Sequence, residues 1–412
     1  MTDEAQIPSP PAPTTPRSER LVSLDALRGF DMFWIIGADA LFQALSRISD
    51  RGPVRVAAEQ LEHADWIGFR FYDLIFPLFV FIVGVSLVFS LTNLIVMHGK
   101  PAAVRRIFRR SVLLYVLALL YYGGFSHEWP DIRLMGVLNR IALCYLVAAL
   151  IFCFVRWKEI ILITVGLLVG YWALLMFVPF PDVRPTPGGN AEICTETGFT
   201  NVAQLNLESP VRIRGVLVKG VNLANYVDQR YLPGRKWDGT WDPEGLLSTL
   251  PAIATCLLGV LVGLLLRNES FSRPRKVVAL LAGGLVCLGL GYAWGIEFPI
   301  IKKIWTSSYV LVAGGCSALL LGVFYLVIDV LQFRFWCRPL VWIGMNPITV
   351  YLAEQVVGFR ALAERFVGGD VGNFLDARLG MGFGQLAIAL VSLSFGILLC
   401  WFLHHKKLFL RV

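Results

Sequence analysis

The stretch HADWIGFRFYDLIFPLFVFIVG, residues 63–84, places a histidine and three charged side chains at the start of a long apolar run. His63 is a candidate general base, because an imidazole with an unperturbed pKa of about 6.5 takes up and returns a proton near neutral pH. A lone loop histidine can equally be an ordinary solvated side chain, and His127 is a second candidate. Asp73 either caps the helix that follows or takes part in the chemistry. The pattern makes His63 a candidate for catalysis and leaves these structural alternatives open.

Polar side chains also fall inside other apolar runs, where each charged group costs about 2.5 to 3.5 kcal/mol and normally faces a partner or an aqueous cavity. The run SLDALRGFDMFWIIGADAL carries charges along one helical face, either as a self-neutralising stripe in which Asp25 pairs with Arg28 or as the wall of a pore. We therefore expect a water-lined passage through the helices. The predicted substrate-binding residues are Asp39, Trp66, Asp73, Asn139, Arg140, Asn346 and Glu354.

A cluster of arginines, at spacings i, i+1, i+4 and i+5, precedes another apolar run. Such a cluster can arise from the positive-inside rule alone. It can also form a bidentate clamp for phosphates, as a carrier such as coenzyme A would need. The predicted cofactor-binding residues are Arg28, Arg105, Arg106, Arg109 and Arg110.

The elements that must position these residues are membrane helices. Of the 412 residues, 56% are hydrophobic and 16% charged, compared with about 25% charged in a typical soluble domain. About ten apolar runs have the length of a spanning helix. They begin near Leu24, Phe71, Ser111, Leu134, Glu159, Leu246, Val277, Ser307, Leu340 and Met381. The sequence thus predicts an all-α fold, a polytopic membrane helix bundle.

The distribution of Lys and Arg in the short connections predicts the orientation. Both termini should be cytoplasmic, and the His63 loop and a large loop at residues 180–245 should face outward. Residues 1–20, which are Pro-rich and polar, should form a flexible cytoplasmic tail, and residues 21–412 a single transmembrane domain. We see no signal peptide and expect a bacterial inner membrane, with membrane lipids as neighbours.

Two features exclude other classes of function. The net charge of +8 lies in short loops without a basic, aromatic-interleaved patch, so we expect no nucleic-acid partner. The eight cysteines show no metal-binding or redox spacing, and Cys194 lacks an obvious disulfide partner, so we expect no metal and no disulfide. The oligomeric state stays open, a homodimer included.

The large loop contains GRKWDGTWDPEGLL, which is dense in Gly, Trp and Asp. Trp237 and Trp241 are either anchors at the membrane interface or part of a polar ligand surface. Tryptophan beside aspartate suits sugars, because their C–H faces are apolar while their hydroxyls need hydrogen-bond partners. Both interpretations remain open on the sequence.

Several stretches together resemble the heparan-alpha-glucosaminide N-acetyltransferase family and its bacterial relatives. The resemblance runs in order from Arg20 to about Glu354. It is carried by RLVSLDALRGFD, HADWIGFRFYDLIFPLFVFIVG, FRRSVLL, GVLNRI, WDPEGLLSTL, IKKIWTSSYVL and GMNPITVYLAE. SLDALRG alone occurs more widely among membrane acyltransferases. This chain has its own loop between Phe180 and Gly245, which leaves the acceptor open.

The resemblance implies transfer of an acetyl group from cytosolic acetyl-CoA to an amino sugar or other saccharide on the outer face. His63 matches the active-site histidine of the family, and Arg110 matches the arginine of its FRRS-like stretch. A base must deprotonate the attacking group and donors must stabilise the oxyanion, for which Asn139, Arg140 and Asn346 are candidates. We favour direct transfer over a ping-pong path in which His63 is acetylated.

Two functions from other classes compete with this one. A secondary transporter of a small polar solute would also place charges and broken helices around a midplane site. It predicts matching broken segments in the two halves, and DLIFPLF has only a loose counterpart in GMNPITV. A non-catalytic membrane subunit of a polysaccharide assembly complex is the third possibility.

Overall fold

The computed structural model describes residues 21–48, 52–126, 128–184 and 205–409. The predicted tail (1–20), His127 and Cys194 lie outside the described residues, as does part of the predicted large loop (185–204). In the described part of the chain, helices dominate and strands are short.

The helices occur in two runs separated by the loop. Those before it are α1 (Val22–Phe33), a π-helix η1 (Trp34–Ala38), α2 (Asp39–Ile48), α3 (Gly52–Gln60), α4 (Phe71–Tyr121), the 3-10 helices η2 (Gly124–Ser126) and η3 (Trp129–Asp131), α5 (Val137–Phe154) and α6 (Trp157–Phe177). Those that follow are α8 (Leu223–Tyr231), α9 (Thr249–Arg267), α10 (Arg273–Gly295), α11 (Ser307–Phe324), a π-helix η5 (Tyr325–Val330), α12 (Arg338–Met345), α13 (Pro347–Val357), α14 (Phe359–Val367), α15 (Gly369–Leu379) and α16 (Phe383–His405).

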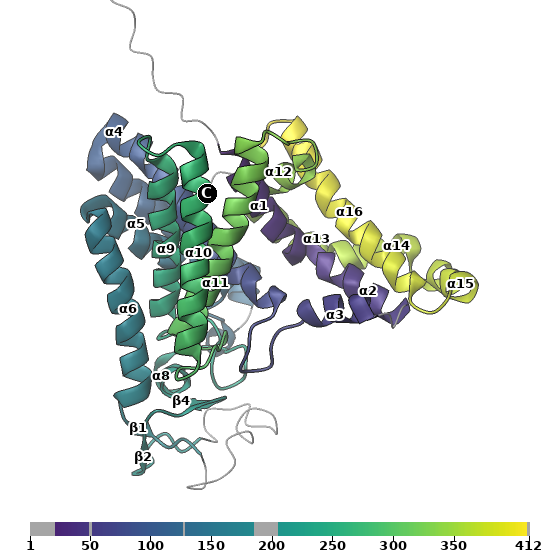
Figure 1. Cartoon of the computed structure of the whole chain (residues 1–412). Helices are drawn as coiled ribbons and strands as arrows, with labels where there is room; N and C mark the ends of the chain where they lie inside the picture. The colour runs from purple at the N-terminus through teal and green to yellow at the C-terminus, as the bar shows by residue number, and fades with distance from the viewer. Residues whose placement is uncertain (1–20, 49–51, 127, 185–204, 410–412) are drawn as a thin grey trace, which may run out of the picture.

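The loop itself is partly ordered by two small antiparallel sheets. β1 (Phe180–Pro181) pairs with β2 (Arg212–Ile213), and β3 (Leu217–Val218) pairs with β4 (Val221–Asn222). Asn222 then caps α8, because its side chain accepts a hydrogen bond from the Asn225 amide. In Figure 1, α4, α5, α6, α9, α10 and α11 stand side by side as one bundle. The strands and α8 lie at one end of this bundle, and α13–α16 lie on the other side of α1.

Helix α4 is too long for one span. Its 51 residues would extend about 77 Å, whereas the apolar part of a bilayer is about 30 Å thick. Gly99 interrupts it at φ 78°, a conformation that glycine adopts without strain. Tyr72 and Tyr121, near its two ends, line adjoining cavities, so the chain reverses direction between them. The second and third predicted spans are therefore the two arms of one element.

Two further helices are interrupted. The α12–α13 pair bends by 79° at Asn346. The first predicted span is divided into α1 and α2 by η1, where Gly37 has φ 114°. Among the described residues, seven helices are long and apolar enough to cross a membrane, or eight if the bent pair is one span, which makes the chain an integral membrane protein. The predicted count of about ten is not confirmed, because α4 is counted once and α1 is short.

Glycines let the main helices pack at backbone distance. A Cβ on Gly84 of α4 would lie 2.0 Å from the Cys256 carbonyl oxygen, and one on Gly259 of α9 would lie 2.0 Å from that of Phe81. The small-residue contact expected at Gly84 therefore joins α4 to α9. A Cβ on Gly29 or Gly344 would likewise clash across the α1–α12 contact. These contacts fix the helices that carry the polar side chains.

Candidate active site

His63 lies in the loop before α4 and forms a cluster with Asp73 and Lys302. Its Nδ1 is 2.9 Å from Asp73 Oδ1, and Lys302 Nζ lies 2.9 Å from Nδ1, 3.3 Å from Nε2 and 3.4 Å from Asp73 Oδ1. The His63 side chain is half exposed, whereas Asp73 is fully buried. We assign the proton of neutral His63 to Nδ1, because an ionised carboxylate can only accept; the Lys302 ammonium, which can only donate, then has Nε2 as its acceptor on the ring. Nε2 then carries the lone pair that a general base needs.

Asp73 is held by the start of α4. Its Oδ2 accepts hydrogen bonds from the Ala64 and Arg70 amides at 3.1 and 3.0 Å, and Tyr309 Oη donates to its main-chain oxygen at 2.8 Å. The predicted capping role is therefore present, and the second carboxylate oxygen is simultaneously directed at His63. One residue serves both the helix and the histidine.

Lys302 comes from the turn between α10 and α11. The Gly68 amide of the His63 loop donates to the Ile300 carbonyl at 2.9 Å, which ties this turn to the His63 loop. The Trp305 amide donates to the Lys302 carbonyl at 2.9 Å. Burial lowers the pKa of the Lys302 ammonium, and the charge of Asp73 opposes that shift.

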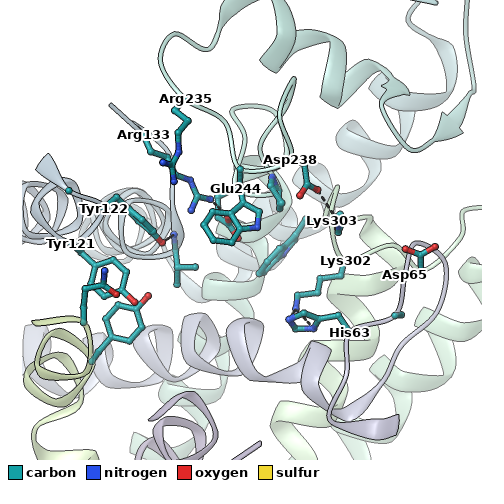
Figure 2. Close-up of a pocket in the computed structure, with 18 residues that line it drawn as sticks. His63, Asp65, Tyr121, Tyr122, Arg133, Arg235, Asp238, Glu244, Lys302 and Lys303 are labelled. Atoms are coloured by element: carbon teal, nitrogen blue, oxygen red, sulfur yellow. Dashed lines mark hydrogen bonds and ion pairs between the residues drawn. The ribbon is translucent and has the colours of Figure 1, made fainter. Parts of the chain in front are cut away.

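Three neighbouring cavities lie between the His63 cluster and the arginines. The histidine cavity, about 780 Å³, is lined by His63, Tyr121, Arg133, Trp237, Glu244 and Lys302, among others. The middle cavity, about 220 Å³, includes Met32, Ile75, Phe76, Phe79, Ile141 and Pro347. The arginine cavity, about 460 Å³, includes Arg28, Ser86, Asn93, Arg106, Arg110 and Tyr145. Figure 2 shows His63 and Lys302 at one side of the histidine cavity, with Tyr121 and Tyr122 across it.

Neighbouring cavities share walls. His63, Lys302 and Tyr351 line both the histidine and the middle cavity. Phe79 and Ile141 line both the middle and the arginine cavity. The three cavities thus follow one another through the helices, and the middle one is lined mostly by apolar side chains.

Helix α13 runs beside all three cavities. Pro347 and Ile348 at its start line the arginine and middle cavities, Tyr351 the middle and histidine cavities, and Gln355 the histidine cavity. The Tyr351 ring stacks on that of Tyr121, with centroids 4.5 Å apart and an interplanar angle of 13°. This contact joins α13 to the end of α4.

The predicted cofactor residues divide into two groups. Arg28, Arg106 and Arg110 line the arginine cavity, whereas Arg105 and Arg109 are exposed and are not among its lining residues. Arg28 donates to Ser86 Oγ at 2.6 Å. It also pairs with Asp25, as expected if the charged face of the first predicted span is a self-neutralising stripe. Arg110 lies over the Tyr145 ring, and its buried Nε has no hydrogen-bond partner.

Three predicted polar residues lie beside the cavities without lining them. Arg140 is fully buried and donates to the Pro243 carbonyl at 2.9 Å and to Ser248 Oγ. Asn139 donates to the Tyr115 carbonyl at 3.4 Å. Among the described residues, neither polar atom of the buried Asn346 side chain, at the α12–α13 break, has a hydrogen-bond partner.

The remaining predicted residues lie around the histidine end. Trp66 Nε1 donates to the Leu217 carbonyl at 2.8 Å, which joins the His63 loop to β3. Asp39 begins α2 and interacts with the Tyr72 hydroxyl. Glu354 is half-buried on α13, next to the cavity-lining Gln355.

Two features of the site were missed by sequence reasoning. Lys302 belongs to the IKKIW stretch quoted above, but neighbouring lysines in a short connection resemble topology signals. Arg133, also missed, forms a buried cluster in which it contacts Asp242 at 2.8 Å and Glu244 at 2.7 Å. Burial and the neighbouring Asp242 raise the pKa of Glu244. Only the folded loop brings these three residues together.

Comparison with known proteins shows which family part of the chain resembles. Residues 20–186 match the family described as "Heparan-alpha-glucosaminide N-acetyltransferase, catalytic". The Mus musculus heparan-alpha-glucosaminide N-acetyltransferase is 27% identical over 336 residues, which are 72% of this chain and 49% of that protein. The Homo sapiens protein of the same name is 28% identical over 335 residues, 72% of this chain and 48% of that protein. The resemblance to heparan-alpha-glucosaminide N-acetyltransferases is confirmed.

The chain spans about half the length of these curated relatives. The segment that matches the heparan-alpha-glucosaminide N-acetyltransferase catalytic family contains His63, Asp73 and the arginine cluster. Lys302 and α13 lie beyond that segment. Among the described residues, no group of three or more His, Cys, Asp or Glu side chains could hold a metal ion.

Proposed function

We propose that the protein is a membrane acyltransferase that moves an acetyl group from acetyl-CoA to an amino sugar or other saccharide. The observation that carries this proposal is the series of cavities between Arg110 and His63. It is supported by relatives named as N-acetyltransferases. A donor bound by its phosphates at Arg28, Arg106 and Arg110 would extend its uncharged arm through the apolar middle cavity. Its thioester would then reach His63.

The arrangement is long enough to join the two sides of a bilayer. Asn93 of the arginine cavity lies 22 residues beyond Phe71 along α4, which is about 33 Å of helix. We propose that the arginine cavity faces the cytoplasm, with both termini, and that the histidine cavity opens outward. The basic residues around the arginine cavity support this orientation. The bacterial inner membrane remains the proposed location.

His63 and Asp73 would perform the proton transfers. Nε2 of His63 takes the proton of the attacking amine or hydroxyl, while Asp73 holds Nδ1–H and stabilises the imidazolium that forms. The thiolate of coenzyme A then receives that proton. Direct transfer remains our proposal, because it requires only this pair.

The transporter alternative predicts matching broken segments in the two halves of the chain, and the helices do not show this match. GMNPITV contains the 79° bend at Asn346, whereas Pro77 of DLIFPLF lies in an arm of α4 whose only non-helical residue is Gly99. The α1–α2 interruption at Gly37 is a separate feature. DLIFPLF and GMNPITV are therefore not matching broken segments.

The test is an assay with purified protein, labelled acetyl-CoA and glucosamine. Wild type should form labelled N-acetylglucosamine, and His63→Ala should lose at least 10²-fold in kcat. Arg110→Met should raise the Kd for acetyl-CoA about tenfold by removing one phosphate contact. Arg105→Met, which removes an exposed arginine outside the cavity, should leave the Kd unchanged. No transfer by wild type over a panel of amino sugars, or full activity in His63→Ala, would refute the proposal.

A further inference from the structure

Acyl transfer requires a donor for the oxygen of the tetrahedral intermediate, because negative charge develops there. The expected donors were Asn139, Arg140 and Asn346. Arg140 donates through Nη2 to the Pro243 carbonyl and Ser248, and Asn139 donates to the Tyr115 carbonyl. None of the three lines a cavity in the described part of the chain. The position of the oxyanion donor must therefore be sought nearer to His63.

Lys302 occupies that position. It is the only lysine or arginine among the described residues that line both the histidine and the middle cavity. Its Nζ lies against the His63 ring, 2.9 Å from Nδ1 and 3.3 Å from the Nε2 that would act as base. Arg133 is held by two carboxylates, and Lys303 by Asp238 at 2.8 Å. The closest carboxylate contact of Lys302 is longer, 3.4 Å to Asp73.

We propose that Lys302 is a catalytic residue whose ammonium stabilises the oxyanion of the acyl transfer. This inference rests on the proposed acetyltransferase function. A lysine ammonium on a flexible four-carbon chain can leave Nε2 and turn toward a carbonyl oxygen beside it. Its departure frees Nε2 to accept a proton, so one movement activates both the base and the electrophile.

The transfer proceeds through a tetrahedral intermediate. The amine nitrogen attacks the thioester carbon, and the carbonyl π electrons move to the oxygen, which Lys302 binds. His63 Nε2 takes one proton from that nitrogen. The carbonyl then re-forms, the C–S bond breaks with its electron pair going to sulfur, and His63 returns the proton to the thiolate. Lys302 keeps its own protons throughout.

Lys302→Met and Lys302→Gln test this role against Lys219→Met, a lysine that pairs with Asp65 and lies outside the lining of the cavities. Both Lys302 variants should lose about 10²- to 10³-fold in kcat, the usual effect of removing one oxyanion donor. The Kd for acetyl-CoA should change less than threefold. Lys302→Arg should recover part of kcat, and Lys219→Met should match wild type.

The outcomes separate the two proposals. If wild type transfers acetyl groups and a folded Lys302→Gln or Lys302→Met retains more than one third of kcat, the role of Lys302 is refuted and the acetyltransferase stands. If the Lys302 variants weaken the binding of acetyl-CoA but keep wild-type kcat, the role of Lys302 is refuted as well. If wild type shows no transfer, the proposed function itself fails. Size-exclusion profiles show whether each variant is folded. Because both Lys302→Met and Lys302→Gln are measured, the test remains decisive if one of them misfolds.

A second observation concerns the tryptophans of the large loop. Trp241 is fully buried and packs edge-to-face on Trp66, with ring centroids 5.9 Å apart, so its role is structural. Trp237 is 60% exposed and lines the histidine cavity. The two tryptophans therefore take different roles although they are only four positions apart.

Trp237 is exposed but held in place. Its amide donates to Asp242 Oδ2 at 3.0 Å, and the Arg133 guanidinium lies 4.9 Å from its ring centroid. Arg133 is itself 4.6 Å from the Tyr122 ring and paired with two carboxylates. A cation therefore lies against the indole on the protein side, where a lipid-facing anchor would have apolar contacts.

We infer that Trp237 is the stacking platform for a pyranose ring of the acceptor. The inference rests on the proposed function. The C–H face of a pyranose suits the exposed indole, and the polar Asp238, Arg235 and Gln355 line the same cavity within reach of hydroxyl groups. Arg235 and Asp238 extend along the rim in Figure 2.

Steady-state kinetics with glucosamine as the varied acceptor test this platform. Trp237→Ala should raise the KM for glucosamine about tenfold, Trp237→Phe should retain most of the affinity, and the KM for acetyl-CoA should not change. Trp129→Ala, which removes an 83% exposed tryptophan outside the cavity lining, is the matched control. An unchanged KM for glucosamine in Trp237→Ala refutes the platform, whereas no transfer by wild type refutes the proposed function.

Discussion

Asp73→Asn separates the helix-capping role of this residue from its role toward His63. The amide oxygen of asparagine can still accept from the Ala64 and Arg70 amides, which hold Oδ2 at 3.1 and 3.0 Å. The amide nitrogen placed at Oδ1 can donate but not accept. It therefore favours the tautomer of His63 that carries its proton on Nε2, which leaves no base facing the substrates.

The magnitude follows from the charge on Asp73. Two unit charges 2.9 Å apart interact by about 6 kcal/mol at an effective dielectric constant of about 20. Because the His63 side chain is 50% exposed, solvent screening reduces this value. A loss of about 3 to 5 kcal/mol of transition-state stabilisation remains, which lowers kcat about 10²- to 10⁴-fold.

The assay measures kcat and the Kd for acetyl-CoA, with the melting temperature as a folding control. Asp73→Asn should keep the Kd and melt within a few degrees of wild type, since the cap is preserved. Glu62→Gln removes a carboxylate from the same loop, 63% exposed and paired with Arg70, and should behave as wild type. If Asp73→Asn keeps more than one tenth of wild-type kcat, the assignment of Asp73 as the partner of the catalytic base is wrong.

Three further predictions concern stability. Arg133→Ala leaves two carboxylates without their buried cation and should cost about 3 to 5 kcal/mol, seen as a lower melting temperature, whereas the exposed Arg235→Ala should have no effect. Burial raises the pKa of Asp228 to about 7, above its unfolded value of about 4, so stability should fall as pH rises between these values. Asp228→Asn should therefore make the melting temperature less dependent on pH over that range. An unchanged pH dependence in this variant would contradict the reasoning. Gly259→Ala places a Cβ 2.0 Å from a carbonyl oxygen of α4 and should reduce the yield of folded protein, whereas Gly289→Ala, with nothing within 4 Å, should not.

The local sequence predicted the helices well, for physical reasons. Apolar runs of spanning length have few alternatives to helix in a membrane, so α4, α5, α6 and α9–α11 lie where the runs predict them. His63 became a candidate because a polar stretch directly precedes α4, and its catalytic role stays a prediction. The reversal at Gly99 and the merging of two spans into α4 depend on tertiary packing, which hydropathy does not encode.

The other polar residues show the limit of the same reasoning. Their types predicted that they would face something polar, and Arg140 and Arg28 do so through carbonyls and hydroxyls of neighbouring elements. Nothing in the spacing distinguishes such partners from a ligand. Lys302 could not be predicted from local spacing, since it approaches His63 from a position 239 residues away in the sequence.

Because α4 folds back on itself at Gly99, its two arms fix a distance within the protein. One arm carries the side chains that follow His63, and the other carries Arg110 and ends at Tyr121, so the separation between the two ends of the passage is set by helical rise and cannot stretch. If coenzyme A is the donor, as we propose, a carrier with a shorter arm would stop below the imidazole. A single residue inserted into either arm would shift everything beyond it by about 1.5 Å and rotate it by about 100°.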